Sequence, residues 1–295
     1  MKAGAKVTLL VRQASVETLK NAPLQITGAL GEHVFQKGSI EVEDAAEPST
    51  GARRADMLIV TTKVYDLRNA LKPFASGGVC PPVLLLQNGM GSAEIATDVL
   101  GDGVPIYSSA MMIGMARTAP MAMHIAGQAG PIKCGALLGH SEGPLEAVLK
   151  CAELGFVLME QDTKIRETVA FKLPFNSCMN PTGALTGLTY AELLKDDFSR
   201  QVLAGLGDET LAVFDQAFDY QPATCGQQYV EDILTAIVVP KAENHSSSMS
   251  QDLQAGRKTE IDFLNGYILA QANRLGLPAV RHQTTHALVS AREAS

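Results

Sequence analysis

The chain has 295 residues, of which 46% are hydrophobic and 19% are charged, and its formal net charge is −7. This composition is that of a globular protein with one large or two medium domains and enough apolar residues to form a core. The acidic balance and the lack of a basic block argue against nucleic acid as a partner.

No membrane or metal association is expected from the sequence. No apolar run approaches the length of about 18 residues that a transmembrane helix needs. The first residues show no export signal, so we expect a cytoplasmic protein. The five cysteines are scattered without a CxxC pair, which predicts reduced thiols and gives no support for a metal site.

Strand-like and helix-like stretches alternate through the first half of the chain. Runs typical of strands lie at 6–11 (KVTLLV), 24–27, 33–42, 56–63, 82–88, 106–114, 121–126, 131–137 and 156–160. Helical patterns between them lie at 16–21, 66–74, 92–100 and 143–153. This alternation predicts a Rossmann-like, doubly wound α/β domain over residues 1–162, with a parallel sheet that binds ligands at the carboxyl ends of its strands.

The second half of the chain has a different character. From about Thr163 the patterns are long and helical, and strand signals almost vanish. The expected helices lie at 163–180, 190–218, 227–238, 257–275 and 281–293. The sequence therefore predicts an all-helical second domain over residues 163–295.

Several residues at predicted strand ends could face a nucleotide. Arg12 follows the strand 6–11, at a position where NAD-preferring dinucleotide folds carry a carboxylate, and a basic residue there favours NADP. Lys63 ends the strand 56–63. In LQNGMG, Gly89 and Gly91 permit close backbone approach beside a helix start, although the complete GxGxxG fingerprint is absent. A surface arginine and a plain strand–helix turn remain the alternative interpretations.

The second half contains an unusual polar stripe. Lys172, Asn176 and Asn180 stand four residues apart, so they share one helix face among apolar neighbours. Buried polar groups need partners, which a bound polar substrate would supply. The alternative is a solvent-facing stripe. Pro174 removes one helix hydrogen bond here, and Glu260 starts a later helix, where a surface role is the alternative.

Four motifs in this order resemble the ketopantoate reductase (2-dehydropantoate 2-reductase) family. They are VTTKVYD, LQNGMG, K-x3-N-x3-N and SSM-x2-D-x3-G-x3-EID-x3-G, and the resemblance runs from residue 4 onward. The family reduces 2-dehydropantoate to pantoate with NADPH, on the route to pantothenate and coenzyme A. The resemblance implies a small-molecule 2-keto acid as the partner, and it leaves the oligomeric state open, with a homodimer as one option.

The resemblance also implies roles for matching residues. Lys172 looks like the general acid, and Asn176 and Asn180 resemble the asparagines that hold the substrate. Ser248 and Glu260 match a serine and a glutamate that contact the substrate, and Glu260 also counts as catalytic and cofactor-binding. Asn88 matches a residue near the nicotinamide ribose and the reacting carbonyl. Lys63 and Arg12 match positions that face the cofactor, with Arg12 at the 2′-phosphate.

The family begins with a strand, a GxGxxG turn and a helix before the strand that 6–11 resembles. The resemblance therefore predicts that this chain lacks the central strand, the glycine loop and most of the first helix. We expect a functional protein with about 20 more residues, the length of such a fragment. The alternatives are a short chain that acts as a non-catalytic binding or assembly module, and a reductase of another 2-keto acid.

Overall fold

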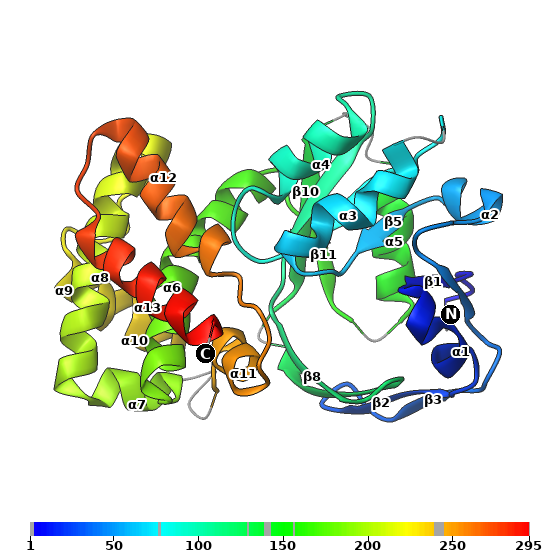
Figure 1. Ribbon diagram of the computed structural model, residues 1–295, viewed down its shortest axis with the longest axis horizontal. Coiled ribbons are helices and arrows are strands. Elements are labelled where there is room, and N and C mark those ends of the chain that lie inside the picture. The colour runs from blue at the N-terminus through cyan, green and yellow to red at the C-terminus, as the bar shows by residue number, and fades with distance from the viewer. Residues whose placement is uncertain are drawn as a thin grey trace. The chain divides into compact units, whose positions relative to one another are not determined.

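The computed structural model describes residues 3–75, 78–128, 130–138, 143–155, 157–238 and 245–294. The chain forms two compact units (Figure 1). The first comprises Met1–Gln87 and Ser92–Thr168, and the second comprises Asn88–Gly91 and Val169–Ser295. The short segment Asn88–Gly91 thus belongs with the helices that follow much later in the chain.

The largest sheet of the first unit is mixed. Its order is β11-β10-β7-β6-β5, formed by β5 (Leu58–Val60), β6 (Val83–Leu85), β7 (Ile106–Ala110), β10 (Ile132–Leu138) and β11 (Met159–Gln161). β5, β6 and β7 are parallel, as predicted, but β10 runs antiparallel to β7. The chain passes from β7 to β10 through two further strands, without the helical crossover that usually joins parallel neighbours. The expectation of a wholly parallel sheet was wrong at this point.

Helices cover both faces of this sheet. α3 (Val64–Ala75) and α4 (Ser92–Leu100) lie side by side on one face (Figure 1). Val83 and Leu85 of β6 pack in one apolar cluster with Leu67 of α3. Leu84 points to the other face, where it clusters with Leu145 of α5 (Gly143–Glu153). The alternation of side chains along a strand thus produces the doubly wound arrangement.

Two smaller sheets complete the first unit. β1 (Thr8–Val11) pairs in parallel with β4 (Glu41–Asp44), and α1 (Gln13–Lys20) follows β1. A four-stranded sheet has the order β3-β2-β9-β8, formed by β2 (Leu24–Gly28), β3 (His33–Phe35), β8 (Ile113–Ala119) and β9 (Ala122–Gln128). A short helix, α2 (Thr50–Arg53), follows β4.

Two predicted strands are each divided between different sheets. The run 33–42 contains β3 and the start of β4, separated by a turn in which the Ser39 amide donates to the Gln36 carbonyl at 3.0 Å. The run 106–114 contains β7 and the start of β8. Apolar patterning marks such segments as extended, but it does not say where a chain leaves one sheet for another.

The strands predicted to form one sheet in the first unit are divided, because β1 does not pair with any strand of the five-stranded sheet among the described residues. Among the described residues, β1 pairs only with β4, and β5 pairs only with β6. Ile59 of β5 is 45% exposed. A cavity of about 690 Å³ lies in this unit and is lined mainly by apolar side chains, among them Val7, Leu9, Leu19 and Val148.

The second unit is helical throughout its described residues. Its elements are α6 (Ile165–Thr186), which starts in the first unit, α7 (Tyr190–Lys195), α8 (Asp197–Phe218), α9 (Gly226–Gln228), the π-helix η1 (Tyr229–Leu234), α10 (Thr235–Val238), α11 (Ser248–Gln254), the 3₁₀ helix η2 (Ile261–Phe263), α12 (Asn265–Leu275) and α13 (Val280–Glu293). No helix that the structure describes is long and apolar enough to cross a membrane.

Two predicted helices are each divided in the structure. The run 190–218 divides at Asp196, whose carboxylate accepts from the Ser199 amide at 2.7 Å and so starts α8. In the run 257–275, residues 257–260 are not helical, η2 follows them, and the regular helix α12 starts only at Asn265.

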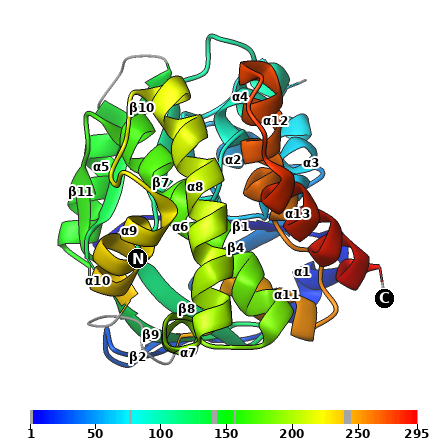
Figure 2. The same ribbon diagram turned by 90° about the vertical axis from the view of Figure 1, so that its left-hand side faces the viewer.

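α6 and α8 supply buried side chains to both apolar clusters of the second unit (Figure 2, where α8 is the long yellow helix). α6 contributes Cys178 and Met179 to one cluster and Leu173 to the other. A helix enclosed in this way is expected to be apolar all round. Polar side chains on α6 therefore need a specific explanation.

Candidate active site

α6 carries the polar stripe identified in the sequence. Asn176 and Asn180 are each only 6% exposed, and Lys172 is partly buried. The solvent-facing alternative is therefore wrong for the two asparagines. The helix also continues through both Pro174 and Pro181.

Lys172 has a defined partner and a shifted pKa. Its Nζ donates a hydrogen bond to Asn88 Oδ1 at 2.9 Å. Burial lowers the pKa of Lys172 to about 8, and the negative charge of Glu260 opposes this shift. The ammonium therefore remains largely protonated at neutral pH, yet it can lose its proton within the physiological range.

The turn that presents Asn88 is fixed by its glycine. Gly89 has a φ of +82°, which L side chains rarely adopt, and a Cβ placed there would lie 2.6 Å from the Phe263 carbonyl oxygen. The same carbonyl accepts from the Met90 amide at 3.2 Å. The turn is thus held against η2, and this contact fixes the backbone that carries Asn88.

Glu260 lies immediately before η2 and is 7% exposed. The surface role considered for this glutamate is therefore wrong. Its neighbour Asp262 differs, because Asp262 is half-exposed and pairs with His286 at 2.8 Å and with Lys258 at 3.8 Å. Of the two acidic residues, Glu260 is the one whose charge acts on Lys172.

Asn180 is held by two residues that the sequence interpretation missed. Tyr190 Oη donates to Asn180 Oδ1 at 2.6 Å, and Ser247 Oγ donates to the Asn180 carbonyl at 3.1 Å. Because Tyr190 binds the carbonyl end of the amide, the NH₂ end is the part that can donate to a ligand. Ser247 is fully buried and caps α11, whereas the predicted Ser248 is exposed. Ser247 is thus a buried serine beside the one predicted to bind substrate, and the assignment of Ser248 to the substrate stays a prediction.

In the first unit, polar groups gather after the strands β1, β5 and β6. Arg12 follows β1, has a side chain that is 85% exposed, and pairs with Asp66 at 3.0 Å. Lys63 stands between β5 and α3 and is partly buried. Gln87 follows β6 and donates through Nε2 to the carbonyls of Val60 and Thr62, both at 2.9 Å. Its Oε1 is buried and has no hydrogen-bond partner among the described residues.

Comparison with known families accounts for both halves of the chain. The model described as ketopantoate reductase PanE/ApbA matches residues 1–139, and the model for the C-terminal part of the same family matches residues 164–293. The chain belongs to the ketopantoate reductase family. Ketopantoate reductases are oxidoreductases that use a nicotinamide cofactor and act on a small keto acid.

Individual relatives agree with this membership. The chain is 25% identical over 294 residues to the 2-dehydropantoate 2-reductase of Aquifex aeolicus, covering 99% of this chain and 91% of that relative. The crystal structure of a PanE/ApbA family ketopantoate reductase from Ralstonia eutropha superposes with a TM-score of 0.84 at 23% identity, covering 99% and 92% of the two chains. D-mandelate dehydrogenase in complex with NADH and anilino(oxo)acetate gives a TM-score of 0.82 at 21% identity with the same coverage. These two structures share the fold of this chain.

Proposed function

We propose that this chain reduces 2-dehydropantoate to pantoate with NADPH. The observation that carries the proposal is the buried stripe of α6, where Lys172 is held by Asn88 and has a pKa of about 8. Reduction of a ketone places negative charge on its oxygen, and a positioned ammonium can stabilise that charge and donate its proton.

In this mechanism the residues around Lys172 have separate roles. Lys172 is the general acid, and the hydrogen bond to Asn88 Oδ1 orients its ammonium. Glu260 keeps the ammonium charged against the effect of burial. Asn176 and Asn180 hold the polar groups of the substrate. Ser248 and Asn88 are further substrate-binding residues implied by resemblance.

The strand ends of the first unit fit a dinucleotide cofactor. The buried Oε1 of Gln87, which has no partner among the described residues, is an acceptor suited to a donor group of a bound nucleotide. Arg12 offers an exposed guanidinium for a 2′-phosphate, and Lys63 and Glu260 are further cofactor contacts implied by resemblance. NADPH, when bound, supplies the hydride.

Replacing Arg12 by alanine should weaken NADPH binding by about 10-fold, because a charged hydrogen bond to a phosphate is lost. NADH binding should change little, since NADH carries no 2′-phosphate. Calorimetric Kd values for the two cofactors check this expectation. Lys20→Ala, at the exposed end of α1, is the control. Equal losses for NADPH and NADH would remove Arg12 from the 2′-phosphate site.

The rate of reduction should depend on the protonation of Lys172. The kcat should fall as the pH rises through about 8, where the ammonium loses its proton. Glu260→Gln removes the charge that raises the pKa of Lys172, so the decline should begin at a lower pH. Asp262→Asn is the control, because Asp262 pairs with Lys258 and His286 instead. A decline that stays in place in Glu260→Gln, or moves to higher pH, would contradict the role of Glu260.

The similarity to D-mandelate dehydrogenase supports one competing substrate, the 2-keto acid of mandelate. Measuring kcat/KM for 2-dehydropantoate and for phenylglyoxylate, each with NADPH and with NADH, separates the two. We expect the highest value for 2-dehydropantoate with NADPH. A higher value for phenylglyoxylate would assign the chain to the second substrate.

A further inference from the structure

Pro181, the residue after Asn180, interrupts the hydrogen bonding of α6. In a regular helix the amide of residue 181 would donate to the carbonyl of Ser177, but proline has no N–H. The carbonyl of Ser177 lies between Asn176 and Asn180, so the missing bond falls at the segment that links them. A buried carbonyl in this position needs another donor.

Asn265 supplies that donor from a distant part of the chain. Its Nδ2 lies 3.1 Å from the Ser177 carbonyl oxygen, and the residue is fully buried at the start of α12. A carbonyl oxygen only accepts hydrogen bonds, so the NH₂ end of the Asn265 amide must face it.

His282 orients the same amide. Asn265 Nδ2 lies 3.0 Å from His282 Nδ1, so this ring nitrogen must be the acceptor and the proton must be on Nε2. The contacts of Nε2 support this assignment, because its N–H can donate to the Leu206 carbonyl at 3.1 Å and to Thr210 Oγ1 at 2.8 Å. Both NH₂ hydrogens of Asn265 are thus assigned, one to His282 and one to Ser177.

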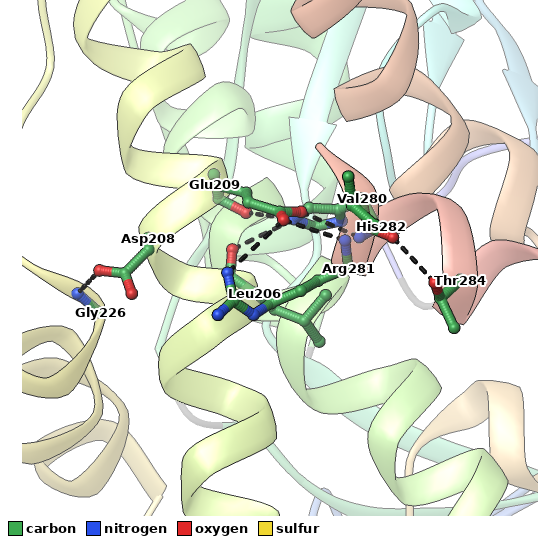
Figure 3. A network of polar contacts seen from close by, with 9 residues as sticks. Leu206, Asp208, Glu209, Gly226, Val280, Arg281, His282 and Thr284 are labelled. Carbon is green, nitrogen blue, oxygen red and sulfur yellow. Dashed lines mark hydrogen bonds and ion pairs between the residues drawn. The ribbon is translucent and has the colours of Figure 1, made fainter. Parts of the chain in front are cut away.

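A side chain of α8 also binds the backbone amide of His282. The Glu209 carboxylate accepts from the amides of Arg281 and His282 at 2.9 and 3.0 Å, at the start of α13 (Figure 3). The contacts with α8 therefore fix the position of the His282 imidazole independently of its contact with Asn265.

We propose that Asn265 is a positioning residue for the reaction: its side-chain amide replaces the backbone donor that Pro181 removes from α6, and it thereby fixes the segment of Asn176 and Asn180 relative to Lys172. This inference rests on the proposed function. Leucine at this position would leave two buried acceptors, the Ser177 carbonyl oxygen and His282 Nδ1, without their donor.

The test compares Asn265→Leu with Thr210→Val, which removes a hydroxyl at the far end of the same network but keeps the bond to Ser177. Asn265→Leu should lower kcat for 2-dehydropantoate about 10-fold, since a small displacement of positioning groups has effects of this size or larger. The KM for NADPH should not change. Thr210→Val should stay within about twofold of the parent chain in both constants.

A second comparison uses Pro181→Ala, which returns a backbone N–H to the Ser177 carbonyl. Hydrogen exchange of the α6 peptides after Ser177 should be faster in Asn265→Leu than in Thr210→Val. In the Pro181→Ala background, Asn265→Leu should no longer accelerate exchange or lower kcat. This rescue is expected only if Asn265 acts through that one carbonyl.

The outcomes separate this inference from the proposed function. Equal exchange in Asn265→Leu and Thr210→Val would overturn the inference, and so would faster exchange with an unchanged kcat. An effect of Asn265→Leu that persists unchanged in Pro181→Ala would also overturn it. A parent chain that consumes no NADPH with any 2-keto acid would instead refute the proposed function, and the exchange data would still decide whether Asn265 holds α6.

Discussion

Replacing Lys172 by alanine should lower kcat for the reduction of 2-dehydropantoate by ~10²–10⁴, the usual contribution of a positioned general acid. The reason is that no other described group combines a hydrogen bond to Asn88 with a pKa near 8. The Kd for NADPH should change little. Steady-state kinetics and calorimetry on the same preparation measure the two quantities.

Two control variants make the result specific. Lys172→Met keeps most of the side-chain volume and should lose as much activity as Lys172→Ala, which excludes a cavity as the cause. Lys164→Ala removes an exposed lysine just before α6 and should leave kcat unchanged. An unchanged kcat in Lys172→Ala would remove Lys172 from the mechanism.

Gly89→Ala should have the second-largest effect. An alanine at a φ of +82° is strained, and its Cβ would lie 2.6 Å from the Phe263 carbonyl oxygen. We expect the free energy of unfolding to fall by about 1–3 kcal/mol. We also expect kcat to fall by about 10², because the turn that positions Asn88 must move away from η2. Denaturant unfolding and steady-state kinetics measure the two effects.

Gly91→Ala is the matched control for this variant. Gly91 also has a positive φ, +99°, but a Cβ there would meet nothing closer than Phe263 Cδ1 at 3.8 Å. The Gly91→Ala variant should therefore be less stable because of backbone strain, while it keeps most of the kcat. Equal losses of kcat in the two variants would show that the contact of the turn with Phe263 does not position Asn88.

The parts of the fold that depend on local patterns could be predicted from the sequence. The parallel strands β5, β6 and β7 and the polar stripe of α6 both follow from regular spacing along the chain. The antiparallel direction of β10 and the division of 33–42 between two sheets depend on pairings between distant segments. Such pairings leave no periodic signal.

The same distinction applies to the candidate site. Lys172, Asn176 and Asn180 are visible as one helix face, but the residues that hold the site lie far from it in sequence. Asn265 is 88 residues from Ser177, with which it shares a hydrogen bond. The missing N–H of Pro181 was the available signal, because it requires a donor from elsewhere without saying which residue supplies it.

The most direct test of the central claim is the rate at which the purified chain consumes NADPH in the presence of 2-dehydropantoate, with the product identified by mass spectrometry. We expect one pantoate for each NADPH oxidised, a lower rate with NADH, and a loss of the reaction in Lys172→Ala. A folded chain that binds NADPH but forms no pantoate, or a Lys172→Ala variant as active as the parent chain, would contradict the account.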